Sequence, residues 1–437
     1  MDKESKTYKN VAKNTKDTQS KAILIGIEFS SSGPSPLDNN LKELNGLAET
    51  AHYNVIAVVS QKLTRINPKS FIGKGKVEEV AQLIRHFSAD IVIFDENLSP
   101  AQNRNLENIF KCRVIDRSWL ILEIFGNHAR PRDAKAQVEL ASLKYALPRL
   151  TKMWGHLSRQ RGGIGMKDVG ETQIQLDRRL IRDRITKLGR KLKQIDLEKT
   201  TQRKNRRGVY KVALVGYTNA GKSTLMNQLT GAETLVENKL FSTLDSTIRK
   251  IKKNFPYPVV LSATIGLIDK LPHDLIASFK STLDEVRDAN LLIRVVDMSD
   301  SNAKRQIQTT NNVINEIGVE NTDSLLVFNK IDKVNDLEIL ESELQRHPKA
   351  IIISSKNGTG LDVLRNSIIS SYESKLSSHQ ITINYEQAKL IPQIRKYAVI
   401  VKSDYEDTFI SLDLRLPPGG KEQIERLLKN TNQAERS

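Results

Sequence analysis

The chain has 437 residues, of which 38% are hydrophobic and 27% charged, and its formal net charge is +17. This length is too great for one hydrophobic core, and it predicts about three domains at ~100–200 residues each. A single cysteine, Cys112, excludes an intramolecular disulfide framework and fits a reducing compartment, so we expect a cytoplasmic protein. The excess positive charge predicts an acidic partner, either nucleic acid or a membrane surface.

The first 20 residues are polar and lack the apolar stretch of a signal peptide, so we expect a disordered arm over residues 1–20. Apolar runs elsewhere, such as Lys211–Val215 and Leu291–Val296, have the length of strands. They fall well short of the roughly 20 residues that cross a bilayer. The sequence therefore predicts no stable membrane insertion, and we expect a monomer.

Strand-like and helix-like segments alternate over residues 21–131. Strands are expected at Ala22–Ile27, Val55–Val59, Asp90–Phe94 and Arg113–Ile115, and helices at Lys76–Phe87 and Ala101–Phe110. Such alternation predicts a small α/β domain with a largely parallel sheet. Within it, Gly73-Lys74-Gly75-Lys76 is open to two interpretations, an ATP site or a turn before a helix, and we favour the turn, in a structural or RNA-contacting role.

Residues 132–207 form a basic segment, with 21 Lys or Arg against 8 Asp or Glu. We expect a hairpin of two helices, at roughly 133–153 and 172–204, joined by the glycine-rich loop Gly155–Thr172. A helix face that is only exposed to solvent needs no more than charges of both signs. An excess of positive charge can in addition neutralise the phosphates of a nucleic acid and release their counterions. Because aromatic residues are scarce here, we predict a nucleic-acid contact made through backbone and shape rather than base stacking.

Residues 208–375 show a doubly wound α/β pattern, for which ligands are expected at the carboxyl ends of the strands. Its strongest motif follows an apolar strand and precedes a helix: Gly216, Tyr217, Thr218, Asn219, Ala220, Gly221, Lys222 and Ser223. This is the phosphate-binding loop, whose backbone N–H groups surround a β-phosphate. We expect Lys222 to act catalytically on the β- and γ-phosphates and Ser223 to ligate Mg²⁺.

A second motif, Asn329-Lys330-Ile331-Asp332, lies beyond another apolar strand and distinguishes GTP from ATP. The Asp332 carboxylate can accept hydrogen bonds from guanine N1–H and the exocyclic amine, which adenine does not offer in that geometry. Asn329 is expected to tie this loop to the phosphate loop, and Lys330 to lie along the base. Backbone N–H groups of Ser354-Ser355-Lys356 can reach the guanine carbonyl. The cofactors expected are therefore GTP or GDP and Mg²⁺.

Two segments between these motifs are candidate switches. In Phe241-Ser242-Thr243-Leu244-Asp245, Thr243 is expected to sense the γ-phosphate through Mg²⁺, as a metal ligand and catalytic residue, and Thr247 is the competing candidate. The second switch is Ala263-Thr264-Ile265-Gly266, in which Gly266 can offer its N–H to the γ-phosphate. Ala263 stands where an Asp is expected, and Leu267 cannot orient a water as Gln does, so we predict slow intrinsic hydrolysis.

The last segment, residues 379–437, contains two strand-like runs, Tyr397–Lys402 and Thr408–Arg415, followed by a helical pattern. It predicts a small α+β domain. The fold class expected is therefore α/β: a P-loop GTPase domain with a doubly wound, mostly parallel sheet. A small α/β domain and a basic two-helix hairpin precede it, and the α+β domain follows.

Beyond its first twenty residues the chain resembles the HflX family of translation-related GTPases. Besides the nucleotide motifs, the resemblance rests on Phe71–Lys76, Ser99–Leu106, Gln137–Leu140, Gly162–Gly165 and Gly170–Gln173. It implies that the hairpin contacts ribosomal RNA near the peptidyl transferase centre and that the protein splits stalled or idle ribosomes. The chain departs from the family pattern at Ala263, where the family has Asp, at Leu267, where it has Phe, and at Lys167-Asp168-Val169, where it has Arg-Gly-Pro.

These features leave three hypotheses of different classes. The first is a GTP-driven factor that binds the large ribosomal subunit and leaves after hydrolysis, in ribosome splitting or in subunit assembly. The second is a degenerate GTPase that holds nucleotide for structure and binds RNA with or without a γ-phosphate, which Ala263 favours. The third is a membrane-associated regulator, although the basic helices lack the large apolar anchors of lipid-binding helices.

Overall fold

The structure is a computed structural model that describes residues 19–29, 37–150, 167–204, 209–232, 240–241, 247–251, 255, 257–264, 266–270, 280–319, 322–334, 337–395, 397–417 and 420–434. It consists of two compact units, which meet in sequence at Leu192 and Lys193. The described residues Leu240 and Phe241 belong to the first unit.

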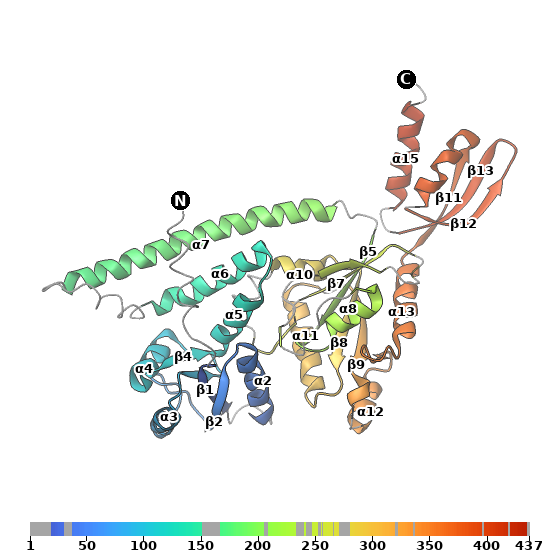
Figure 1. Cartoon of the computed structure of the whole chain (residues 1–437). Coiled ribbons are helices and arrows are strands. Elements are labelled where there is room, and N and C mark those ends of the chain that lie inside the picture. Colours follow the sequence, from blue (N-terminus) through green and yellow to red (C-terminus); the bar gives the residue numbers. More distant parts are fainter. Residues whose placement is uncertain are drawn as a thin grey trace. The chain divides into compact units, whose positions relative to one another are not determined.

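The first unit contains a four-stranded parallel sheet of order β2-β1-β3-β4 (Figure 1). The strands are β1 (Lys21–Phe29), β2 (Asn54–Leu63), β3 (Ile91–Phe94) and β4 (Arg113–Asp116). The helices around it are α2 (Leu37–Thr50), α3 (Lys74–Phe87), α4 (Pro100–Phe110) and α5 (Arg117–His128). The predicted small α/β domain with a parallel sheet is thus confirmed.

Helix α3 begins directly after Gly73, the residue for which the sequence left two interpretations open. The Gly73 amide donates to Gln61 Oε1 at 3.1 Å, and Lys76 forms an ion pair with Glu79 at 2.8 Å. These contacts engage two of the groups that a phosphate would need. They favour the interpretation as a turn before a helix over that as an ATP site.

Helices α6 (Arg132–Ala146) and α7 (Lys167–Lys204) form the basic element, with a 3-10 turn, η1 (Leu147–Arg149), after α6. They pack through Ala136 and Leu140 of α6 and Leu188 of α7, and Arg184 bonds Glu139 at 2.7 Å. Two predicted boundaries were wrong. Helix α6 ends at Ala146 because Pro148 disfavours continuation of the helix, and α7 already begins at Lys167. The glycines Gly162–Gly165 lie outside the described residues.

The second unit contains a six-stranded sheet of order β10-β9-β8-β5-β7-β6, parallel except for β6. The strands are β5 (Tyr210–Gly216), β6 (Thr247–Lys250), β7 (Val259–Ala263), β8 (Leu291–Asp297), β9 (Asp323–Asn329) and β10 (Ile351–Ile352). Parallel pairing requires a crossover after each strand, and the apolar strands must be covered on both faces.

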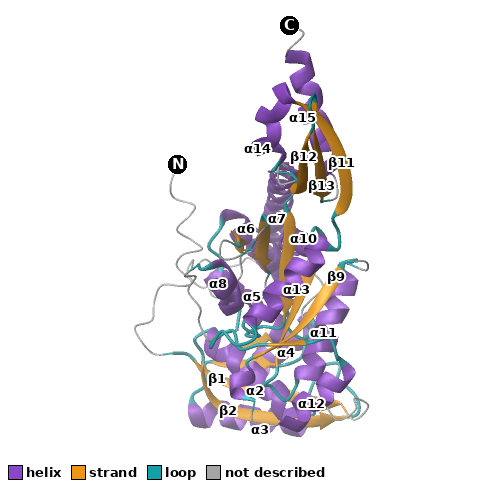
Figure 2. Ribbon diagram, turned by 90° about the vertical axis from the view of Figure 1, so that its right-hand side faces the viewer, coloured by secondary structure: helices purple, strands orange, loops and turns teal. Residues whose placement is uncertain are grey.

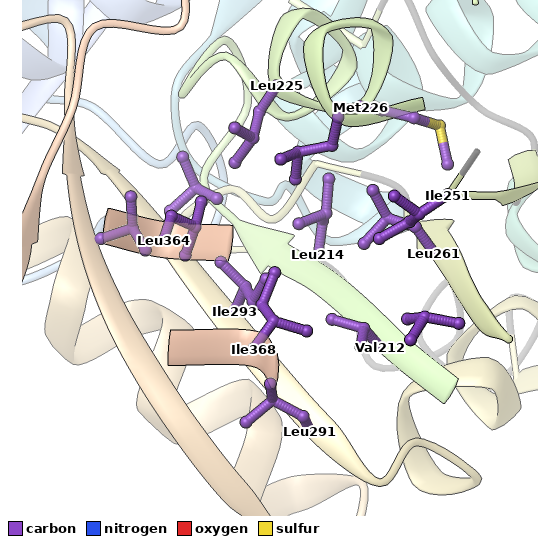
Figure 3. Packing of buried hydrophobic residues seen from close by; sticks show 14 of the residues in the cluster. Val212, Leu214, Leu225, Met226, Ile251, Leu261, Leu291, Ile293, Leu364 and Ile368 are labelled. Carbon is purple, nitrogen blue, oxygen red and sulfur yellow. The ribbon is translucent and has the colours of Figure 1, made fainter. Parts of the chain in front are cut away.

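Helices cover both faces of this sheet. On one face α8 (Lys222–Thr230) and α13 (Leu361–Glu373) bury Leu225, Met226, Leu364 and Ile368 against Val212 and Leu214 of β5 (Figure 3). On the other, α10 (Lys280–Arg287) and α11 (Ala303–Glu316) pack on Ala213 and Val215. Helix α12 (Leu337–Arg346) packs beside α11 on Leu326 and Phe328. The doubly wound, mostly parallel sheet predicted for this domain is confirmed.

The chain ends in an antiparallel sheet of order β11-β13-β12 with helices beside it (Figure 2). Its strands are β11 (Ser377–Asn384), β12 (Val399–Tyr405) and β13 (Phe409–Leu416), and its helices are η4 (Tyr385–Leu390), α14 (Ile391–Ile394) and α15 (Gly420–Ala434). Strand β11 was not expected from the sequence, because only Ile383 of this polar strand is buried. No helix within the described residues is long and apolar enough to cross a membrane.

Candidate nucleotide-binding site

The carboxyl ends of β5, β9 and β10 bring three sequence motifs to one edge of the second sheet. The phosphate loop follows β5, Asn329 ends β9, and Ser354 follows β10, whose neighbour Ile353 donates its N–H to Phe328 O at 2.8 Å. Strand order reverses at β5, which lies between β8 and β7. Ligands of doubly wound sheets bind at such a switch point.

The phosphate loop adopts a backbone that glycine makes possible. Gly216 has φ +155°, and a Cβ there would lie 2.2 Å from Val295 O. Gly221 has φ +94°, and a Cβ there would lie 2.3 Å from Asn329 Nδ2. Asn219 also has a positive φ of 58°, which Asn tolerates better than most residues. The loop ends where α8 begins at Lys222, so the N-terminal N–H groups of that helix face the same place.

Lys222 is the buried cation of this loop. Its ammonium donates to Gly216 O at 2.9 Å and Tyr217 O at 2.6 Å. Burial, and then the positive charge of Lys330, lower the pKa of Lys222 to about 7. A phosphate beside this ammonium would favour its charged form. The cradle therefore fits a polyanion.

Asn329 connects the three motifs. Its side chain is 1% exposed, and its Nδ2 donates to Ala220 O of the phosphate loop at 2.8 Å. Its Oδ1 accepts from the backbone N–H of Ser355 at 2.9 Å and from the Ser355 hydroxyl. The amide is thereby fixed in orientation, since its donor and acceptor ends are both used.

Asp332 is the exposed carboxylate of the guanine motif. The Ser354 hydroxyl donates to Asp332 Oδ1 at 2.6 Å. This bond lowers the pKa of Asp332, and nearby Lys356 lowers it further. An ionised carboxylate at the end of a fixed loop is able to accept two N–H donors of a guanine edge. Lys330, with φ +61°, pairs with Asp297 at 2.7 Å, and the Ile331 N–H donates to Ile353 O.

The structure describes little of the first switch. Ser242, Thr243, Leu244 and Asp245 lie outside the described residues, as does Ile265 of the second switch. Phe241 is 2% exposed, and its ring meets that of Phe125 edge to face at 4.7 Å within the first unit. Thr247, the competing candidate, begins β6 and pairs with Ala263.

The second switch lies directly on the phosphate loop. Leu267 donates its N–H to Gly216 O at 3.0 Å and accepts from the Thr218 N–H at 2.8 Å. The Asp269 N–H donates to the Tyr217 hydroxyl at 2.9 Å. A Cβ at Gly266 would lie 2.8 Å from the Thr218 Cα, so only glycine fits.

Two contacts of this segment were not expected from the sequence: the hydrogen bond from the Asp269 N–H to the Tyr217 hydroxyl, and the ion pair between Asp269 and Arg305 of α11. No motif marks them, because they depend on how α11 and the segment after β7 pack together. They show that the second switch is held by protein contacts next to Ala263.

The donor set for Mg²⁺ is small. The described residues hold no group of three His, Cys, Asp or Glu that could bind a metal. Ala263 is 1% exposed and brings no oxygen from its side chain. Of the two predicted ligands, only Ser223, at the start of α8, lies within the described residues, because Thr243 does not. Mg²⁺ commonly takes few protein ligands and completes its shell with waters and substrate phosphates. The site therefore fits Mg²⁺ that a nucleotide brings with it.

The fold, the phosphate loop and the guanine motif together define a P-loop GTPase. Four family models match the sequence in chain order. Their descriptions are GTP-binding GTPase N-terminal (residues 38–126), GTP-binding GTPase Middle Region (128–206), 50S ribosome-binding GTPase (211–330) and HflX C-terminal domain (339–437). The chain belongs to the HflX family of GTPases, as its resemblance indicated.

Relatives match over nearly the whole chain. GTPase HflX of Flavobacterium psychrophilum is 42% identical over 394 residues, which cover 89% of this chain and 95% of that protein. GTPase HflX of Escherichia coli K12 is 38% identical over 405 residues, 92% and 94% of the two chains. The crystal structure of a GTP-binding protein from Sulfolobus solfataricus in complex with GDP is 26% identical and covers 81% of this chain and 98% of that one, with a TM-score of 0.43.

Replacing Asn329 with Ala is expected to weaken GDP binding about 10- to 100-fold, because the Ser355 N–H and Ala220 O each lose a buried partner. Titration of a fluorescent GDP analogue measures this loss. Ser355→Ala is the matched control: it removes one hydroxyl bond to the same amide, so its loss should be clearly smaller. Equal losses in the two variants would contradict the role given to the Asn329 amide.

Nucleotide affinity is expected to fall as pH rises above 7. The pKa of Lys222 is lowered from 10.5 to about 7 in the nucleotide-free protein, so in this range the ammonium gives up its proton unless phosphate holds it. The slope should approach about tenfold per pH unit. The stability of the nucleotide-free protein changes in the opposite direction. Between pH 7 and 10.5 the unfolded chain binds more protons than the folded one, so the free energy of unfolding rises with pH. Calorimetry in buffers of different ionisation enthalpy measures proton uptake.

Lys222→Met is the control for this titration, because its side chain cannot take up a proton. It should bind GDP more weakly and without that slope. The same slope in the variant would assign the effect to another group.

Proposed function

We propose that this chain binds the large ribosomal subunit through ribosomal RNA and hydrolyses GTP there, in splitting or rescue of stalled ribosomes or in subunit biogenesis. The observation that carries the proposal is the pairing, in one chain, of a guanine-nucleotide site with a long basic helix. The family description for residues 211–330, 50S ribosome-binding GTPase, supports it.

Helix α7 supplies the surface for RNA. Of its 38 residues, those with described side chains include a series of exposed cations: Arg179, Arg182, Arg184, Lys187, Arg190, Lys191 and Lys193. Only Leu188 is buried among residues 175–199. Exposed cations along a long helix suit a phosphate backbone, whose neutralisation releases counterions.

In the nucleotide site we assign roles as the motifs suggest. Lys222 bonds the β- and γ-phosphates, Ser223 and Thr243 hold Mg²⁺, and Gly266 offers its N–H to the γ-phosphate. Asp332, positioned by Ser354, selects guanine. Hydrolysis is slow in the free protein, because Ala263 gives no anchor to a metal-bound water and Leu267 does not orient the attacking one.

The degenerate GTPase is the second candidate, and the specific observation for it is the buried methyl group of Ala263. In that account the nucleotide stabilises the fold, and RNA binding does not depend on the γ-phosphate. We place the protein in the cytoplasm as a monomer under either account.

GTP turnover by the purified protein, with and without large ribosomal subunits at physiological salt and Mg²⁺, separates the two. We expect the subunits to raise the rate at least about tenfold, or 1.4 kcal/mol off the barrier. A variant with Arg190, Lys191 and Lys193 changed to Gln should lose most of this stimulation and keep the basal rate. Co-sedimentation with subunits but no stimulation would establish the second candidate instead.

A further inference from the structure

The phosphate loop contains a buried hydroxyl for which the described part of the chain offers no hydrogen-bond partner. Thr218 is 6% exposed, and its Oγ1 is buried without a hydrogen-bond partner among the residues that the structure describes, which leave out Ile265 and residues 242–246. Most buried side-chain polar atoms are paired, because leaving one unpaired costs about 1–3 kcal/mol. A buried, unpaired hydroxyl inside a substrate site therefore points to a partner that arrives with the substrate.

The backbone fixes where this side chain lies. The Thr218 N–H donates to Leu267 O at 2.8 Å, and the Leu267 N–H donates to Gly216 O at 3.0 Å. A Cβ on Gly266 would lie 2.7 Å from the Thr218 Cγ2. The methyl group of Thr218 therefore lies against Gly266, the residue whose N–H we assign to the γ-phosphate.

The described residues next to Thr218 are poorly suited to orient a water molecule near Gly266. The Thr264 hydroxyl donates a hydrogen bond to Leu214 O at 2.9 Å. The side chain of Ala263 is a methyl group. The side chain of Leu267 is a hydrocarbon, and this residue is 6% exposed. Thr218 carries a hydroxyl able to donate one bond and accept two.

We propose that Thr218 is a catalytic residue whose hydroxyl positions the attacking water. This inference rests on the proposed GTP hydrolysis. It gives the site a group that orients the attacking water, which Leu267 does not supply. The hydroxyl accepts a hydrogen bond from the water, leaving a water lone pair directed at the γ-phosphorus. The water oxygen then bonds to that phosphorus while the bond between the phosphorus and the β–γ bridging oxygen breaks. The bridging oxygen keeps the electron pair on GDP, the water proton passes to a γ-phosphate oxygen, and Thr218 keeps its own proton.

Two substitutions isolate the hydroxyl. Thr218→Val keeps the shape and removes the hydroxyl, whereas Thr218→Ser keeps the hydroxyl and removes the methyl group. Single-turnover hydrolysis of GTP labelled at the γ-phosphate measures the chemical step for the full-length protein. We expect Thr218→Val to slow it at least about tenfold, with GTP and GDP affinities within about twofold of wild type. Thr218→Ser should retain most of the rate.

Three outcomes would overturn the proposal. Equal rates for wild type and Thr218→Val would remove the hydroxyl from the reaction. A loss of affinity with an unchanged rate would make it a ground-state contact, and equal slowing in Thr218→Ser would assign the effect to packing. In each of these the proposed function stands, because wild type hydrolyses GTP. No hydrolysis by wild type, with or without large subunits, would overturn both.

Discussion

The hydrogen bonds of one buried amide hold the nucleotide site together. Asn329 ends β9, yet its side chain bonds the phosphate loop after β5 and the serine pair after β10. Gly221 has no room for a side chain because that amide lies against it. The order of the parallel strands makes this possible, since it gathers the carboxyl ends of β5, β9 and β10 at one edge. A motif for phosphate and a motif for guanine thereby act on one ligand.

A second constraint is the close contact of the second switch with the phosphate loop. Gly266 meets Thr218, and Leu267 makes two backbone bonds to the loop. Where a carboxylate at position 263 would hold the switch through a metal-bound water, this chain holds it through the Tyr217 hydroxyl and the Asp269 backbone. The second switch can therefore be ordered although Ala263 provides no carboxylate. Whether GTP is hydrolysed then depends on the groups that contact the attacking water.

The fold was predictable from the sequence because apolar strands and amphipathic helices alternate with the periods that a doubly wound sheet requires. The phosphate and guanine motifs were predictable because their chemistry fixes their residues. Strand β11 was not, since a polar edge strand with one buried isoleucine carries no clear pattern. Nor was the isolation of the Thr218 hydroxyl, which depends on where the second switch packs. Local sequence does not encode such contacts.

The proposed function requires that a guanine nucleotide control binding to the large ribosomal subunit. The most direct test is the dissociation constant of the full-length protein for purified large subunits, measured with a non-hydrolysable GTP analogue and with GDP at one salt concentration. The account predicts at least about tenfold tighter binding with the analogue, or 1.4 kcal/mol of coupling. Equal affinities in the two states would contradict it and would leave a protein that binds RNA whichever nucleotide it holds.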